Sequence, residues 1–195
     1  YRFYTQGWTW VEQRTQKGLK RGLSCFEEAS AVDRDFSLAL VGQAYALLGL
    51  FGYGYEENKH TLSRAEELIH EALNQDANLA EAHSAMGLLY TSRQEGREAI
   101  QALKKAVKLR PGYANAHNKL SWIFQLMGNK KQAFKSAQKA VDLDPFSPEA
   151  IINLAYSHLV NGHLSDALKY AKKAYELQPD WPTTSFYIAL IHYHG

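Results

Sequence analysis

Residues 99–111 read AIQALKKAVKLRP, and the same pattern returns at 133–145 as AFKSAQKAVDLDP and at 167–179 as ALKYAKKAYELQP. Each copy begins with alanine, has another alanine seven positions later and ends in Leu-x-Pro, and consecutive copies lie 34 residues apart. A fixed period of this length predicts a chain built from one structural unit that is repeated and stacked.

The prolines mark where the helices of this unit should begin and end. Proline has no backbone N–H and interrupts a helix interior, so one helix should end shortly before each proline of the 34-residue series. That series consists of Pro111, Pro145 and Pro179. Pro148 and Pro182 each follow a proline of the series by three residues, where proline favours the first turn of the next helix. Ser147 is the expected cap in front of Pro148.

Glycines and other small residues complete the unit. Three glycines fall between the two helices predicted for each pair and favour short turns there: Gly96, Gly128 and Gly162. A small residue also recurs in one phase within the first helix of each pair, at Gly87, Ser121, Ala155 and Ala189. Small residues let two helix backbones approach closely. The sequence therefore predicts an all-α fold of stacked antiparallel helix hairpins.

This pattern resembles the tetratricopeptide repeat, which has a small eighth residue, an aromatic residue three positions later, and then alanine, aromatic, alanine and proline. The units 80–113, 114–147 and 148–181 match it without gaps. Two units depart from the family at its early tryptophan or leucine, where His83 and His117 stand. The resemblance implies a right-handed superhelical α-solenoid whose concave face is lined by the first helix of each pair.

The repeat phase extends upstream, so we predict a single array over residues 1–195. Residues 2–15 are expected to form a first helix and residues 61–75 a second helix. The expected hairpins are 1–34, 35–79, 80–113, 114–147 and 148–181, followed by a terminal helix at 182–194. The second hairpin carries 11 extra residues near 50–60, which we interpret as a variable surface loop beside the groove.

The repeat phase also predicts a binding surface. A fold does not fix a function, but the usual use of such a concave face is to hold an extended segment or a helix of a partner. We therefore predict a non-catalytic scaffold that binds a protein or peptide. The residues predicted to line its groove are Leu88, Asn115, Asn118, Trp122, Gln125, Ile152, Tyr156 and Leu159. The alternative interpretation is that the aromatic rings only pack one first helix against the next.

The terminal helix adds Phe186, Leu190 and Tyr193 to the same face. These apolar side chains fit a homodimer through this helix, or a second helix that is missing because the sequence is an excised fragment. Some members of the family bind the C-terminal carboxylate of a partner protein between cationic and amide side chains. We predict no such binding site here. Its positions would hold only one cation, Lys119, and Glu149 would repel a carboxylate.

Composition excludes several other functions. Lys plus Arg is 22 and Asp plus Glu is 20, so the net charge of +2 gives no reason to expect nucleic-acid or membrane binding. Lysines gather on the second helices. The simplest interpretation is that they form a solvated face, and the more specific alternative is that they dock onto an acidic partner. With Cys25 as the one cysteine and no paired histidine motif, we predict no cofactor, no metal site and no catalysis.

The first 50 residues allow a narrower comparison. Tyr4-x2-Gly7, Trp10, the stretch from Arg14 to Leu19 and the stretch from Cys25 to Ala29 resemble one subgroup of these arrays. In bacteria that subgroup follows the DNA-binding domain of transcription regulators or the catalytic domain of nucleotide cyclases. The resemblance implies, as the alternative function, a regulatory module with an intramolecular or signalling partner. We expect a cytoplasmic location.

Overall fold

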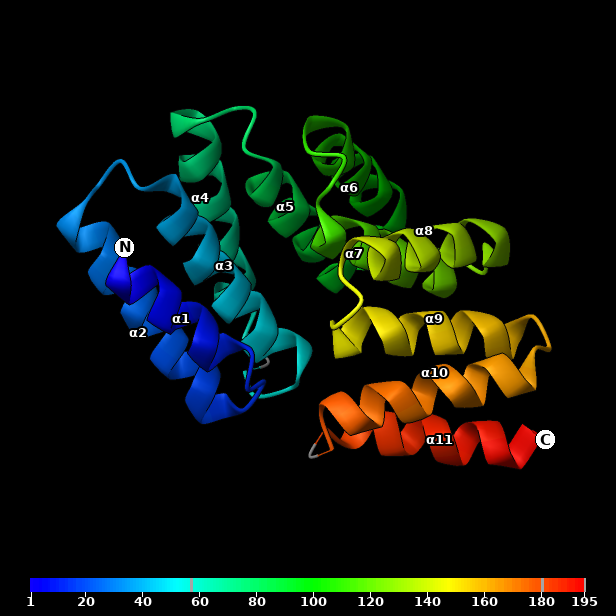
Figure 1. Ribbon diagram of the computed structural model, residues 1–195. Coiled ribbons are helices and arrows are strands. Elements are labelled where there is room, and N and C mark those ends of the chain that lie inside the picture. The colour runs from blue at the N-terminus through cyan, green and yellow to red at the C-terminus, as the bar shows by residue number, and fades with distance from the viewer. Residues whose placement is uncertain (57, 180, 195) are drawn as a thin grey trace. The chain divides into compact units, whose positions relative to one another are not determined.

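The structure is a computed structural model that describes residues 1–56, 58–179 and 181–194. Within these ranges every regular element is a helix, so the predicted all-α fold of helix hairpins is confirmed (Figure 1). The chain divides into two compact units, Tyr1–Leu109 and Arg110–Gly195. The single array over 1–195 stays a prediction.

The N-terminal unit contains three helix hairpins. In each pair the two helices pack against one another, and the first helices also contact each other in the order α1, α3, α5. The helices of this unit are α1 (Arg2–Val11), α2 (Gln16–Val32), α3 (Ser37–Gly52), α4 (Lys59–Gln75), α5 (Ala80–Ser92) and α6 (Gly96–Leu109).

The core of the N-terminal unit begins at the ring of Phe26, which is 0% exposed. Two glycines let α1 and α3 approach this ring. A Cβ atom added to Gly7 would lie 2.5 Å from the ring, and one added to Gly42 would lie 2.6 Å from it. Trp8 packs on the same ring, with the ring centroids 5.3 Å apart. Small residues therefore allow one large ring to fill the space between three helices.

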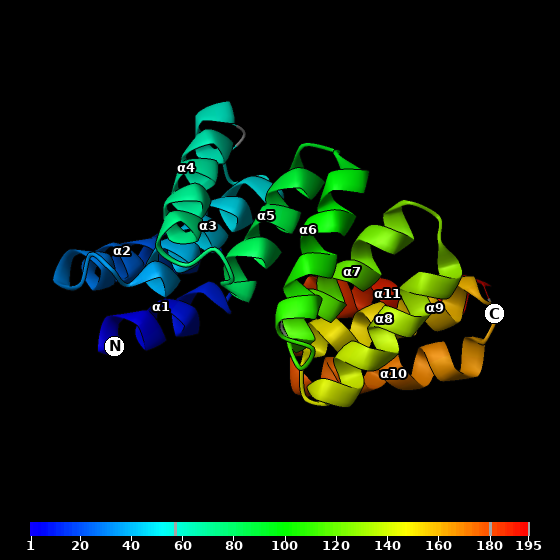
Figure 2. The ribbon, with the colours of Figure 1, turned by 90° about the horizontal axis from the view of Figure 1, so that it is seen from above.

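The C-terminal unit contains two hairpins and one further helix. Its helices are α7 (Ala114–Leu126), α8 (Lys130–Leu143), α9 (Pro148–Val160), α10 (Leu164–Leu177) and α11 (Pro182–His194). The first helices contact each other in the order α7, α9, α11, while α8 packs on α7 and α9, and α10 packs on α9 and α11 (Figures 1 and 2). Its core contains many alanines, which are 0% exposed at Ala137, Ala140, Ala155, Ala167, Ala171 and Ala174.

The helix boundaries lie where the prolines predict them. The helices α6, α8 and α10 each end two residues before the prolines of the 34-residue series. Pro148 is the first residue of α9, and the hydroxyl of Ser147 accepts a hydrogen bond from the backbone N–H of Ala150 at 3.3 Å. The predicted cap at Ser147 is therefore confirmed.

The turns within the hairpins differ from the prediction at one place. Gly128 and Gly162 adopt left-handed φ angles of 70° and 81°, as expected for short turns between helices. The expected third turn residue, Gly96, is instead the first residue of α6. Gln94 takes its place with φ of 65°, because it lies 34 residues before Gly128. The geometry of the turn thus follows the repeat phase rather than the position of the nearest glycine.

The extra residues near 50–60 form less loop than predicted. Helix α3 continues to Gly52 and α4 begins at Lys59, so part of the insertion lengthens the two helices. The segment between them packs on the first hairpin: Tyr55 donates a hydrogen bond to the carbonyl of Arg14, and Lys20 lies 3.4 Å from Glu56. Glu57 lies outside the described residues. A role of this segment beside the groove stays a prediction.

Candidate functional site

The first helices of the C-terminal unit are joined by buried polar contacts. Asn153 on α9 donates a hydrogen bond of 2.7 Å to Asn118 on α7, and both side chains are buried. The amide nitrogen of Gln125 lies 3.0 Å from the carbonyl of Asn153 and 3.2 Å from the hydroxyl of Ser157. A fully bonded polar network fixes one helix against the next more specifically than apolar contact alone. The network therefore holds the two helices of this face in one register.

Aromatic side chains surround this network. Trp122 on α7 is 39% exposed, which is unusual for a large ring that could be buried. Tyr156 on α9 is partly buried and packs edge-on against Tyr187 of α11, with ring centroids 5.5 Å apart. Burial raises the pKa of Tyr187, so its hydroxyl stays protonated near neutral pH. The face of α7, α9 and α11 thus presents neutral aromatic surface.

A cavity of about 480 Å³ opens where α8, α9 and α11 meet the turn between α9 and α10. Two of the predicted groove residues, Tyr156 and Leu159, line it together with Leu190 of the terminal helix. The other lining residues are Lys130, Val160, Gly162 and Leu164. Lys130 donates a hydrogen bond of 2.9 Å to the carbonyl of Val160, so the cavity has an apolar interior with an ammonium group held at its edge. We call it the apolar cavity.

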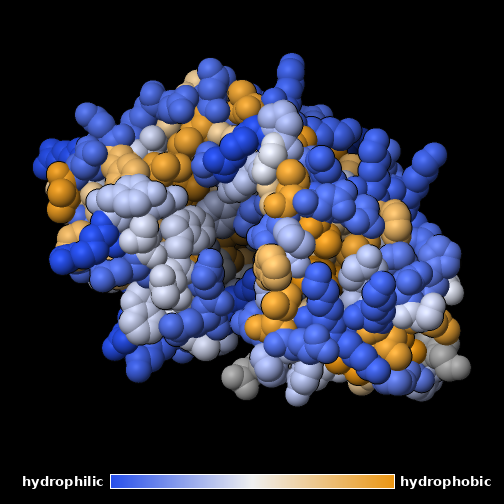
Figure 3. Space-filling view, viewed as in Figure 1, coloured by the Kyte–Doolittle hydropathy of each residue, from blue (hydrophilic) through white to orange (hydrophobic). Residues whose placement is uncertain are grey.

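A second cavity, of about 380 Å³, shares Lys130 with the first. Its other lining residues are Lys131, Phe134, Asn161 and His163. We call it the cationic cavity, because two ammonium groups, an amide and an imidazole face it. Figure 3 shows small hydrophobic patches between hydrophilic residues over α8, α9 and α10, which agrees with apolar and charged surface lying side by side in this region.

His158 lies beneath the cationic cavity and fills the aromatic place predicted for it. It is 9% exposed, stacks on Tyr170 at 5.3 Å and meets Phe134 edge-on at 5.0 Å. Burial lowers the pKa of His158, and the nearby His163 lowers it further. The carboxylate of Asp166, 4.0 Å from Nδ1, raises this pKa, but its effect is smaller than that of burial. Among the described residues the buried Nδ1 atom has no hydrogen-bond partner. The ring is therefore neutral at pH 7 and serves packing.

The predicted groove residues fall into three groups. Trp122 and Asn115 are exposed. Gln125, Tyr156 and Leu159 are partly buried. Asn118 and Ile152 are buried, at 4% and 2% exposure, so in this structure they support the face from below rather than present side-chain surface. The eighth, Leu88, is partly buried on α5 of the N-terminal unit. Binding by any of these residues stays a prediction.

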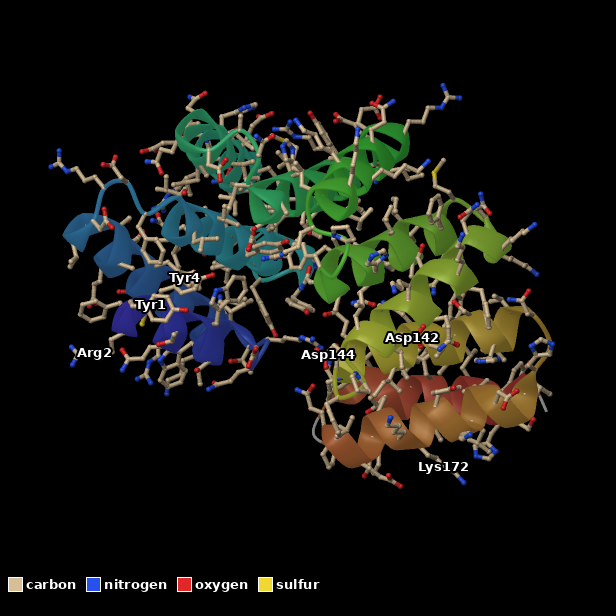
Figure 4. All side chains as sticks on the ribbon, turned by 45° about the horizontal axis from the view of Figure 1, so that its top comes forward. Tyr1, Arg2, Tyr4, Asp142, Asp144 and Lys172 are labelled. Carbon is tan, nitrogen blue, oxygen red and sulfur yellow. The ribbon has the colours of Figure 1, made fainter. Side chains whose placement is uncertain are left out.

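Repeat phase did not predict the residues at the turn edge. Lys130, Gly162 and Leu164 line the apolar cavity although they stand on α8, in the turn before α10 and at the start of α10. One signal was available in the sequence: two lysines open α8, where the helix dipole favours acidic residues. The second-helix lysines further along behave as expected for a solvated face, as Lys172 on α10 is exposed and points away from the helix (Figure 4).

The two histidines that depart from the repeat pattern share one structural role. The Nε2 atom of His83 lies 3.0 Å from the carbonyl oxygen of Ala77, and that of His117 lies 3.0 Å from the carbonyl oxygen of Pro111. Both carbonyls belong to the segment that leads into the helix carrying the histidine, so the rings fix these linkers. In the part of the chain that the structure describes, no group of three His, Cys, Asp or Glu side chains could hold a metal ion.

Comparison with known proteins decides the family. A family model described as TPR repeat matches residues 87–128, and a second one, described as tetratricopeptide repeat, matches residues 114–147. The second range is the unit that the proline spacing predicts. The chain carries tetratricopeptide repeats. Such repeats form scaffolds for protein–protein interaction, and their fold is generally non-catalytic. No curated protein matches the sequence.

Several solved structures share the fold, and two of the three named next are described as TPR proteins. The thermophilic TPR protein TTC0263 of Thermus thermophilus is 20% identical with a TM-score of 0.75, covering 98% of this chain and 99% of that one. YrrB, described as a TPR protein with an unusual peptide-binding site, is 18% identical with a TM-score of 0.56, covering 86% and 82%. Human IFIT1, solved as a dimer with m7Gppp-AAAA, is 14% identical with a TM-score of 0.79, covering 96% of this chain and 45% of IFIT1.

Those identities show the fold and not a shared ligand. None of the helices in the described ranges combines the length and the apolar character that crossing a membrane requires.

Proposed function

We propose that the C-terminal unit binds an extended or helical peptide segment of a partner protein on the face of α7, α9 and α11. The observation that carries this proposal is the apolar cavity lined by residues of α9 and α11, two helices of this face. The cavity, of about 480 Å³, is lined by Tyr156, Leu159 and Leu190, and Trp122 on the same face is 39% exposed.

These side chains have the character of binding anchors. Exposed tryptophan and tyrosine are enriched among the residues that contribute most to the free energy of binding at protein interfaces. The buried contacts of Asn118, Asn153 and Gln125 hold α7 and α9 in place before a ligand arrives. A preformed face loses little conformational entropy on binding, which favours affinity. YrrB, a protein of the same fold that has an unusual peptide-binding site, supports the same class of ligand.

The proposal can be tested with selected peptides. A random peptide library displayed on phage is selected against the full chain, and an enriched peptide is then titrated by calorimetry. The double variant Trp122→Ala, Tyr156→Ala should weaken binding by about thirtyfold, because it removes two anchors at about 1 kcal/mol each. The matched control is Phe146→Ala, Tyr175→Ala, which removes two exposed rings that lie outside α7, α9 and α11.

The control should bind as the wild type does. Undiminished affinity in the Trp122, Tyr156 variant, or an equal loss in the control, would refute the proposed face. A library that yields no enriched peptide would refute peptide binding itself.

The regulatory alternative uses the same scaffold with a different partner. In a bacterial transcription regulator or nucleotide cyclase, the peptide segment would belong to another domain of the same protein. The residues that carry this resemblance include Gly7 and Phe26, which meet in the core of the N-terminal unit. Sequencing the gene upstream of Tyr1 tests this alternative, and finding no DNA-binding or cyclase domain there would contradict it.

The terminal helix supports a third proposal, self-association. Phe186 and Tyr193 are 62% and 84% exposed on α11, and burying large exposed rings favours association. Replacing both by serine should shift sedimentation from dimer to monomer, and a wild-type chain that is already monomeric would contradict dimerisation. The absence of catalysis, of nucleic-acid and membrane binding, and a cytoplasmic location stay predictions.

A further inference from the structure

The two cavities of the C-terminal unit meet at one side chain. Lys130 lines both the apolar cavity and the cationic cavity, and its ammonium group is anchored on the carbonyl of Val160 at the end of α9. A ligand that fills the apolar cavity therefore passes directly beside a fixed positive charge. The neighbouring cavity adds Lys131 and His163 as further nitrogen groups.

Among the described residues, no carboxylate lies within 4.0 Å of Lys130 or Lys131. The carboxylate of Asp166 instead lies 4.0 Å from the buried Nδ1 of His158. The two ammonium groups therefore form no ion pair with the described carboxylates, and a ligand carboxylate placed there would gain charge-assisted hydrogen bonds from them.

The start of α8 places two cations where the helix end favours anions. The first turn of a helix favours acidic side chains, because the free N–H groups create positive potential there. Helices α5, α6, α9 and α10 carry an acidic residue there, whereas α1, α2, α3, α4, α7 and α11 do not. Helix α8 has no acidic residue in its first turn and begins with Lys130 and Lys131. Places where a sequence departs from local preference are often functional sites.

We infer that the ligand is an acidic peptide that inserts an apolar side chain into the apolar cavity and places a neighbouring Asp or Glu carboxylate in the cationic cavity. This inference rests on the proposed function, since the apolar cavity is its anchor. Lys130 would contact both parts of the ligand, and Lys131 only the carboxylate. Charge complementarity would then select the ligand, because an apolar cavity alone accepts many side chains.

The lysines further along α8 provide the control. Lys139 is exposed on the same helix and lies outside the lining of both cavities. Lys131→Glu and Lys139→Glu change the net charge of the protein by the same amount. A difference between them therefore reports the cationic cavity and not the general positive charge of the helix.

The experiment is the phage selection described above, analysed in two ways and repeated on the Lys131→Glu chain. Enrichment of apolar residues at one position tests the proposed function, and enrichment of Asp or Glu beside it tests the inference. The wild-type selection should show both. The Lys131→Glu selection should lose the acidic preference and keep the apolar one. For one selected acidic peptide, Lys131→Glu should weaken binding about tenfold and Lys139→Glu less than about twofold.

Apolar enrichment without acidic enrichment would overturn the inference and leave the proposed function standing. Equal weakening by the two charge reversals would also overturn it, since the acidic preference would then belong to the whole helix. A selection without apolar enrichment would overturn the proposed function. Circular dichroism of both variants shows whether each remains folded.

Discussion

Trp8 in the N-terminal unit and Trp122 in the C-terminal unit stand at the same position of their repeats, one residue after Gly7 and Ser121. Trp8 packs edge-on against Phe26, with ring centroids 5.3 Å apart. Trp122 remains 39% exposed. The same repeat position therefore holds a partly buried ring packed on the core in one unit and an exposed ring in the other, because the neighbouring helices differ. Repeat phase assigns a helix face, and the packing partners decide whether that face is available for binding.

The largest expected effect separates these two tryptophans. Trp8→Ala should lower the free energy of unfolding by about 3 kcal/mol, because it removes a large, partly buried ring that packs on Phe26 and Tyr45. Trp122→Ala should change it by less than about 1 kcal/mol, since exposed side chains contribute little to stability. Calorimetric unfolding of both variants measures the difference. Equal destabilisation would show that Trp122 is a core residue and would break the comparison.

The small residues give a second contrast between the units. Gly42 lies against Phe26, and an added Cβ atom would come within 2.6 Å of the ring. The corresponding place in the C-terminal unit holds Ala155, whose methyl group is accommodated at 0% exposure. Gly42→Ala should therefore destabilise the N-terminal unit by about 1–3 kcal/mol through overpacking.

Gly52 provides the control for that substitution, since a Cβ atom there would meet nothing within 4 Å. Gly52→Ala at the end of α3 should be neutral or stabilise by up to about 1 kcal/mol. Urea unfolding monitored by tryptophan fluorescence compares the two variants. A tolerated Gly42→Ala would mean that the close approach of α3 to Phe26 is not required.

Sequence periodicity predicted the architecture well, for a physical reason. Prolines and small residues act on the backbone directly, so Pro148 opens α9 and Ser147 caps it as expected. The prediction failed where a residue was judged by its type instead of its repeat phase: Gly96 was expected in a turn, yet Gln94, 34 residues before Gly128, takes the left-handed angle. At this turn the repeat phase and the residue type predict different positions for the left-handed residue, and the structure follows the repeat phase.

The candidate site was only partly predictable. Tyr156 and Leu159 follow from repeat phase and do meet at one cavity. The exposure of Ile152 and Asn118 could not be read from phase, because both depend on how closely α7 and α9 pack. Lys130 reaches the cavity from α8, and such a contact between different repeats is set by the turn geometry rather than by any short motif.

The turns themselves offer a third test, with opposite signs in the two units. Gln94→Gly should stabilise the N-terminal unit by about 1 kcal/mol, because glycine adopts the left-handed angle of 65° without strain. Gly128→Ala should destabilise the C-terminal unit by a similar amount, since its φ is 70°. Thermal unfolding measures both shifts. Two shifts of the same sign would contradict the turn assignment.

The smallest expected effect concerns pH. Burial lowers the pKa of His158 in the C-terminal unit and of His83 in the N-terminal unit below the ordinary value of 6.5. As the pH falls through about 6.5, the unfolded chain takes up a proton that the folded chain does not, so both units should lose stability. Stability returns as the pH rises above this range.

Substituting His158 isolates the contribution of the C-terminal unit. His158→Phe should flatten the dependence of the melting temperature on pH between about 7.5 and 5.5, because phenylalanine does not titrate. The exposed His192→Gln variant should keep the wild-type slope. A slope that His158→Phe leaves unchanged would mean that this ring is not buried in its neutral form.

The central claim is that the face of α7, α9 and α11 is a binding surface, and nuclear magnetic resonance tests it most directly. Backbone amide shifts of the full chain are followed while a phage-selected peptide is added. We expect the perturbed amides to cluster on these three helices and at Lys130 and Lys131, and the Trp122→Ala, Tyr156→Ala variant to remove the perturbation. Shifts confined to other helices, or perturbation that survives in that variant, would contradict the account.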